Sequence, residues 1–131
     1  MKYVINIVED EKDLNELVKS YLENSGYEVR SYYTYDEANA HVQDDDVHLW
    51  ILDIMLDNKS GFDLIERIKA YSPSTPVVFM SARDKEFDRI IGLEKGSDDY
   101  ITKPFSPKEL GSIISLEGLI VRIFRQKLMA I

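Results

Sequence analysis

Five positions in this 131-residue chain carry the residue types that handle a phosphoryl group and a divalent cation. They lie at the ends of four short apolar runs, which cover residues 3–8, 48–52, 77–80 and 100–102. Glu9 and Asp10 follow the first run, Asp53 the second, Ser81 the third and Lys103 the fourth. Short runs rich in branched and aromatic residues are typical of interior strands. Open α/β sheets bind their ligands at the carboxyl ends of such strands, so we expect the five side chains to converge.

The chemistry that this set suits is phosphoryl transfer to a carboxylate. Glu9, Asp10 and Asp53 offer the hard oxygen ligands that Mg²⁺ prefers. Asp53 can accept a phosphoryl group when the surrounding negative charge is neutralised. Lys103 can pair with one phosphoryl oxygen, and the Ser81 hydroxyl can donate a hydrogen bond to another. Positioning and charge neutralisation carry most of phosphoryl transfer, so little further chemistry is required of the protein.

The segments between these runs are predicted to be helices. Residues 12–24 carry an apolar stripe at helical spacing, consisting of Leu14, Leu17, Val18, Tyr21 and Leu22. Gly26 provides a left-handed cap after that helix. A further strand is expected at residues 29–32. A capping box of Thr34 and Glu37 then opens a helix through about Val42.

The second half of the chain continues the alternation. Residues 57–61 read as a loop, and Ser60 caps a helix that ends before Pro73. Another helix holds Phe87, Ile90, Ile91 and Leu93, with Gly96 as its stop signal. Residues 106–109 open a fifth helix, with proline at its first position. Five strands alternating with five helices predict an α/β fold with a parallel sheet covered on both faces.

Composition limits the classes of protein that fit. The hydrophobic fraction of 44% and charged fraction of 31% are those of a globular domain, and 131 residues suffice for one. No apolar stretch reaches the roughly 18 residues of a membrane span. A net charge of −8 argues against direct nucleic-acid binding. The chain has no cysteine and no signal-peptide layout, which fits a cytoplasmic protein.

Taken together, these motifs make the chain resemble a response-regulator receiver domain of bacterial two-component signalling. The likeness covers residues 2 to about 110. It rests on five stretches in a fixed order: Val8-Glu9-Asp10-Glu11, Leu52-Asp53-Ile54-Met55-Leu56, Gly61-Phe62-Asp63, Met80-Ser81-Ala82-Arg83 and Asp98-Asp99-Tyr100-Ile101-Thr102-Lys103-Pro104-Phe105.

The resemblance implies a role for each site residue. Asp53 is the phosphoacceptor, and Glu9 and Asp10 are the metal-binding acidic pair. Met55 contributes a backbone carbonyl to Mg²⁺, and Lys103 binds the phosphoryl group. Ser81 and Tyr100 are the switch residues, and the Lys103–Pro104 peptide bond is expected to be cis.

The resemblance also implies a fold and partners. The fold is flavodoxin-like, a doubly wound five-stranded parallel sheet of order 2-1-3-4-5 with five helices. The phosphoryl group comes from the phosphohistidine of a sensor histidine kinase, and the chain is not an enzyme beyond catalysing its own phosphorylation and dephosphorylation. Residues 85–100 resemble the subfamily joined to winged-helix (OmpR-type) DNA-binding domains, which implies a transcriptional output. The remaining residues cannot hold such an effector domain, so any DNA contact would be made outside this chain.

Two rival readings belong to other classes. An aspartate-nucleophile phosphatase of the haloacid dehalogenase type needs a second aspartate two residues after the nucleophile, and Met55 occupies that position. A phosphorylation-independent interaction module on the same fold is the alternative that remains. Binding of acetyl phosphate or beryllofluoride with Mg²⁺ separates it from the main prediction.

The C-terminal segment departs from the family pattern. We expect a receiver domain at residues 1–112, followed by an atypical apolar helix or tail at 113–131. The apolar residues of that tail fall nearly all round a helix, and Gly111 and Gly118 weaken it. An arginine that the family carries near Ile113 is absent. We therefore expect a homodimer through this region that is more apolar and less dependent on phosphorylation than the family's usual one.

Overall fold

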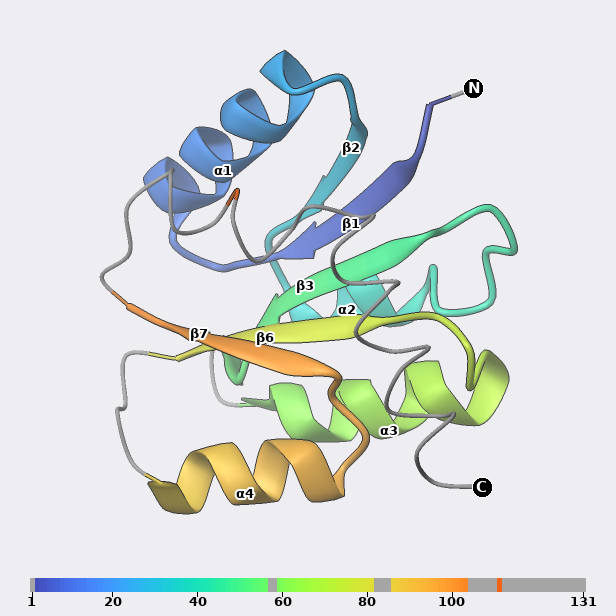
Figure 1. Cartoon of the computed structure of the whole chain (residues 1–131), viewed down its shortest axis with the longest axis vertical. Helices are drawn as coiled ribbons and strands as arrows, with labels where there is room; N and C mark the ends of the chain where they lie inside the picture. Colours follow the sequence, from blue (N-terminus) through green and yellow to red (C-terminus); the bar gives the residue numbers. More distant parts are fainter. Residues whose placement is uncertain (1, 57–58, 82–85, 104–110, 112–131) are drawn as a thin grey trace.

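The computed structural model describes residues 2–56, 59–81, 86–103 and 111. Five strands form one parallel sheet in the order β2-β1-β3-β6-β7, as predicted (Figure 1). These are β1 (Val4–Val8), β2 (Glu28–Tyr32), β3 (Leu49–Asp53), β6 (Val77–Ser81) and β7 (Asp99–Thr102). Every pairing within this sheet is parallel, so all five strands end at the same edge.

Helices cover both faces of the sheet. On one face α1 (Lys12–Asn24) buries Val18 and Leu22 against residues of β1, β3 and β6. On the other face α2 (Tyr35–Asn39) and α3 (Gly61–Tyr71) pack on a second apolar cluster that contains Trp50 and Phe79. α4 (Glu86–Glu94) lies beside α3 in Figure 1. The fifth predicted helix and the Lys103–Pro104 bond lie outside the described residues.

Most of the predicted element boundaries are confirmed. α1 spans the predicted residues, and Gly26 and Gly96 both have positive φ, of 98° and 108°, after the helices that precede them. The predicted stripe of α1 is wrong at Leu17, which is 54% exposed. The buried face is instead centred on Asn15, Val18 and Leu22, at spacing i, i+3, i+7, and Leu17 lies to the side of that line.

The structure differs from the prediction in two short segments. Residues 57–61 were expected to be a loop, but β4 (Met55–Leu56) and β5 (Lys59–Ser60) pair antiparallel as a small hairpin. Strands of two residues are too short to show any periodicity in a sequence. The helix that Thr34 caps ends at Asn39 instead of about Val42, because the His41 N–H bonds to Ala38 O and begins a turn.

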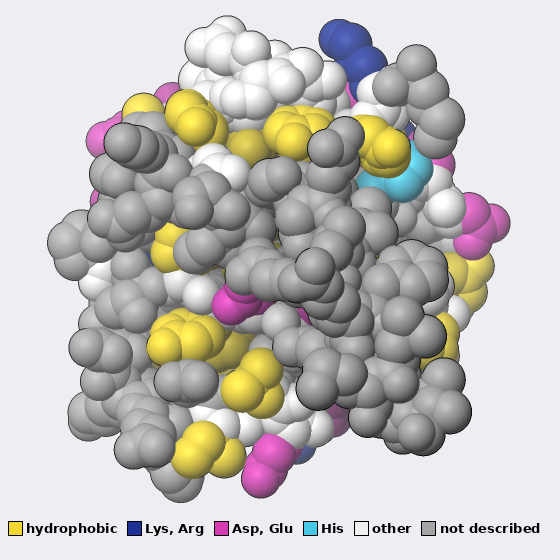
Figure 2. Space-filling model, viewed as in Figure 1, with side chains coloured by type: hydrophobic (Ala, Val, Ile, Leu, Met, Phe, Trp, Pro, Cys, Tyr) yellow, Lys and Arg dark blue, Asp and Glu magenta, His cyan; other side chains and the backbone are white. Residues whose placement is uncertain are grey.

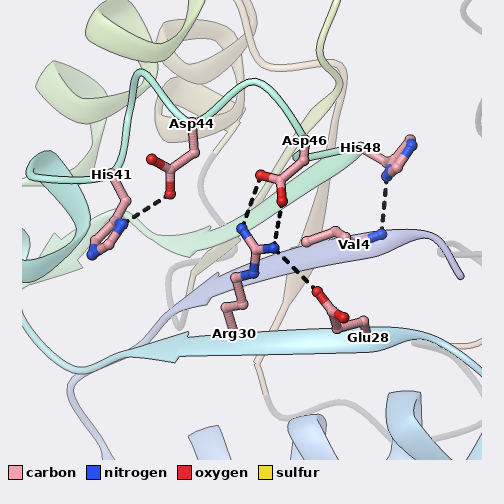
Figure 3. A network of polar contacts seen from close by, with 7 residues as sticks. All are labelled: Val4, Glu28, Arg30, His41, Asp44, Asp46 and His48. Carbon is pink, nitrogen blue, oxygen red and sulfur yellow. Dashed lines mark hydrogen bonds and ion pairs between the residues drawn. The ribbon is translucent and has the colours of Figure 1, made fainter.

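That turn belongs to a polar network that joins the α2–β3 connection to β2 and β1 (Figure 3). Arg30 on β2 donates to both carboxylate oxygens of Asp46, at 2.9 and 2.5 Å, and to Glu28 at 3.1 Å. His41 contacts Asp44 at 2.8 Å, and the Val4 N–H donates to Nδ1 of His48 at 3.0 Å. Asp44 and Asp46 of the acidic turn at residues 44–46 are thus paired within the protein.

Two further features of the molecule are its exposed apolar side chains and the lengths of its helices. Apolar side chains reach the surface at several separate places (Figure 2). The large apolar residues that are exposed in the described part of the chain are Tyr3, Leu17, Met55, Tyr71, Ile90 and Leu93. In the described part of the chain no helix has the length and apolar character needed to cross a membrane.

Candidate functional site

Three acidic side chains meet at the carboxyl edge of the sheet. Glu9 and Asp10 follow β1, and Asp53 is the last residue of β3, the strand paired with β1. One carboxylate oxygen from each residue lies within 4.8 Å of the other two. Glu9 is fully buried, Asp53 is 7% exposed and Asp10 faces solvent. The predicted acidic cluster is therefore assembled, with one ligand open to the outside.

A lysine lies between the two buried carboxylates of this cluster. Nζ of Lys103 donates to Oδ2 of Asp53 at 2.8 Å and also to Oε1 of Glu9. Burial disfavours the charge of Lys103, but the hydrogen bonds to Asp53 and Glu9 outweigh it and raise the lysine pKa. Residue 103 follows β7 at the edge of the sheet, 50 residues beyond Asp53, so only the fold brings these groups together.

The charge balance of the cluster favours a divalent cation. One lysine against three carboxylates leaves two negative charges when all are ionised. Burial, opposed by the hydrogen bond from Lys103, raises the pKa of Glu9 to about 7, and the nearby charge of Asp53 adds to the rise. Carboxylate oxygens are hard ligands that suit Mg²⁺. The described residues Glu9, Asp10 and Asp53 thus fit a metal ion of this kind, which would relieve their mutual repulsion.

The Asp53 carboxylate is held in one orientation from two sides. Oδ1 accepts a hydrogen bond from the Met55 N–H at 2.9 Å, while Oδ2 accepts from Lys103. The backbone of Met55 therefore lies beside the carboxylate. Its carbonyl as a metal ligand stays a prediction.

The predicted switch residues occupy the two strands beyond Asp53. Asp53 pairs with Met80, so Ser81 follows one residue further along the same edge, and Ser81 pairs with Thr102. Tyr100 is half-buried, and its ring stacks on Phe79 with centroids 5.7 Å apart. Phe79 in turn packs on α4, where a Cβ at Gly92 would lie 2.6 Å from Cζ of that ring. Tyr100 is therefore connected to α4 through Phe79.

Asn15, which holds the site, was not singled out from the sequence, and Gly61 was named there only as part of a loop and of a family stretch. Asn15 on α1 is fully buried and donates to the backbone carbonyls of Glu9 and Tyr32, at 3.0 and 3.1 Å. A Cβ at Gly61 would lie 2.7 Å from Cα of Ile54 and closer still to the carbonyl oxygen of Asp53. The signal for Asn15 was its place on the line of Val18 and Leu22. No spacing rule could have shown the close approach of Gly61.

Comparison with known proteins decides the family. The family model described as "Response regulator receiver domain" matches residues 5–115. The chain belongs to this family. The receiver domain is 48% identical over 126 residues to "Transcriptional regulatory protein CssR" of Bacillus subtilis (strain 168), a match that covers 96% of this chain and 55% of the relative. The chain thus spans about half the length of this relative.

Solved structures agree with the receiver fold. A CheY-like receiver domain protein from Methanospirillum hungatei JF-1 superimposes with a TM-score of 0.86 at 27% identity, over 95% of this chain and 99% of that one. DrrB, described as a Thermotoga maritima OmpR/PhoB homologue, superimposes with a TM-score of 0.79 at 29% identity, over 87% of this chain and 51% of that one. The predicted resemblance to the OmpR-type branch of the family is thereby confirmed.

Proposed function

We propose that this receiver domain takes a phosphoryl group from the phosphohistidine of a sensor histidine kinase onto Asp53. The observation that supports this most directly is the position of the Asp53 carboxylate. It lies at the sheet edge, bonded to Lys103, within reach of the same cation as Glu9 and Asp10. A carboxylate oxygen of Asp53 attacks phosphorus, the N–P bond breaks, and its electron pair returns to the imidazole nitrogen.

The residues around Asp53 have separate tasks in this transfer. Glu9, Asp10 and Asp53 would hold Mg²⁺ together with the Met55 carbonyl, and the bound ion would supply positive charge to the phosphoryl oxygens. Lys103 exchanges its contact with Asp53 for a phosphoryl oxygen, as a compact point charge. Ser81 donates to a second phosphoryl oxygen, and the resulting movement reaches Tyr100. Water later hydrolyses the acyl phosphate, so the chain catalyses only its own modification.

We further propose that the phosphorylated domain controls transcription and that the protein acts in the cytoplasm. The relative CssR is described as a transcriptional regulatory protein, and the chain covers about half of its length. A net charge of −8 argues against phosphate contacts by the receiver itself, so DNA would be bound outside it. A homodimer through residues 113–131 remains part of this proposal, although that segment lies outside the described residues.

The test is the intact mass of the protein after incubation with Mg²⁺ and acetyl phosphate. The wild-type chain is expected to gain one phosphoryl group, and Asp53→Asn none. Asp13→Asn, at an exposed position of α1, is the matched control and should be labelled like wild type. Labelling of Asp53→Asn at another residue would contradict the assignment. Failure of the wild-type chain to bind beryllofluoride with Mg²⁺ would favour the phosphorylation-independent module.

A further inference from the structure

Asn15 is a buried polar residue that belongs to no predicted motif. It lies in the first turns of α1 on the face that packs against the sheet, and its side chain is fully buried. A helix face that covers a sheet normally carries apolar residues, as Val18 and Leu22 do further along. A buried amide is costly unless its polar atoms are bonded. Its Oδ1 has no hydrogen-bond partner among the described residues, so burial of this amide carries a cost, which indicates a task for its Nδ2 donor.

The Asn15 amide joins three elements at one point. Its Nδ2 donates to the carbonyl of Glu9 at 3.0 Å and to the carbonyl of Tyr32 at 3.1 Å. Tyr32 ends β2, and the same carbonyl accepts the Glu9 N–H at 3.0 Å. The side chain of Asn15 thus closes a small ring of hydrogen bonds around the backbone of Glu9, at the junction of β1, α1 and β2.

This ring acts on a segment that carries repulsive charge. Glu9 and Asp10 lie close to Asp53, and their carboxylate oxygens lie within 4.8 Å of one another. The segment also lacks the usual support at the start of α1, since the N-cap residue Glu11 makes no side-chain cap bond. The Glu11 N–H donates at 3.2 Å to Oε2 of Glu9 instead. Asn15 is thus one of the described groups that fix the backbone of this segment from the core side.

We infer that Asn15 is a positioning residue for the Mg²⁺ site, holding the backbone of Glu9 and Asp10 in the metal-binding arrangement before the ion arrives. The inference rests on the proposed function of the acidic cluster. Groups that orient metal ligands from behind commonly change metal affinity by about 10–100-fold when removed. Asn15 contacts no ligand atom, so its loss should weaken binding without removing a ligand.

The experiment is calorimetric titration of the folded protein with Mg²⁺, using Asn15→Leu, which keeps a similar volume and loses both donors. We expect Mg²⁺ affinity to fall about tenfold or more. The Mg²⁺ concentration for half-maximal phosphorylation by acetyl phosphate should rise by a similar factor. The maximal rate at saturating Mg²⁺ should stay within about twofold of wild type, because the ion then restores the arrangement.

Two further variants separate positioning from general stability. Val18→Ala lies on the same buried face of α1 and removes core packing without touching the Glu9 backbone. It should lose stability but keep wild-type Mg²⁺ affinity. Asn15→Ser retains one donor on a small side chain, so its Mg²⁺ affinity should lie between those of Asn15→Leu and the wild-type protein. This variant also tests the inference if Asn15→Leu does not fold. Wild-type affinity in both Asn15 variants, or an equal loss in Val18→Ala, would overturn the inference. Absence of Mg²⁺ binding by the wild-type protein would instead refute the proposed function.

Discussion

Replacing Gly61 by alanine tests how closely the backbone around the phosphoacceptor is packed. Gly61 is the first residue of α3, directly after the N-cap Ser60, and its φ lies outside the left-handed region. In a helix without other constraints, glycine to alanine would stabilise by up to about 1 kcal/mol. Here the added methyl group would lie 2.7 Å from Cα of Ile54, where carbon atoms normally approach to about 3.5–4.0 Å.

The size of the effect follows from this overlap. About 1 Å of movement is needed, either in the start of α3 or in the backbone of Asp53 and Ile54. Overpacking of this kind costs roughly 1–3 kcal/mol. Subtracting up to about 1 kcal/mol for the helix preference of alanine, we expect the free energy of unfolding to fall by up to about 2 kcal/mol. A displacement of about 1 Å at a reacting group can cost about 100-fold in rate, so phosphorylation by acetyl phosphate should slow by about 10–100-fold.

Urea unfolding and the time course of intact mass would measure the two effects. Gly26→Ala is the matched control, because Gly26 has φ of 98° and no atom within 4 Å of the added Cβ. That substitution should cost roughly 1–2 kcal/mol through backbone strain alone and leave the phosphorylation rate unchanged. If Gly61→Ala were as stable as wild type and equally fast, the close approach to Asp53 would not constrain the site.

Three other outcomes are expected. Lys103→Met should lower the free energy of unfolding by about 2–3 kcal/mol at pH 7 without Mg²⁺, because two buried carboxylates lose their cation. The loss should be smaller at pH 5, where Glu9, whose pKa is raised to about 7, is protonated in the folded state; an equal loss at both pH values would contradict this. Ser81→Ala, at a polar strand end, should change the free energy of unfolding by less than about 0.5 kcal/mol. The core change Leu64→Ala should cost about 2–5 kcal/mol, and a similar loss in both variants would refute this prediction. The unphosphorylated protein should sediment as a dimer at low micromolar concentration, and deletion of residues 113–131 should abolish the dimer. A monomer whose mass is unaffected by the deletion would exclude a dimer interface in this segment.

The fold and the central groups of the site were predictable because they are encoded in local patterns. Continuous apolar runs identified the strands, and the polar residues that follow these runs were placed by the rule that parallel strands end together. The N-caps Thr34 and Ser60 were equally readable, since each accepts the backbone hydrogen bond that its position predicts. These features depend on residues a few positions apart, and spacing rules apply at that range.

What the sequence did not reveal depends on contacts between distant segments. Asn15 was passed over because its place on the line of Val18 and Leu22 indicates burial at most and not the two carbonyls that it meets in the fold. The β4–β5 hairpin has two residues per strand and leaves no periodic signal. Leu17 was expected to be buried from its spacing, but the buried face of α1 is centred on Asn15, Val18 and Leu22.

The order of the strands has a consequence for how the protein is made. From β1 outward through β3, β6 and β7, the sheet is added in the order in which the chain leaves the ribosome. A domain generally folds as a unit, and Lys103 follows the last strand of this sheet, so the acidic cluster cannot be completed until residue 103 has been added. Until then the nascent acidic cluster lacks the lysine that bonds its two buried carboxylates. The two buried carboxylates are therefore neutralised by this lysine only when nearly all of the described domain has been synthesised.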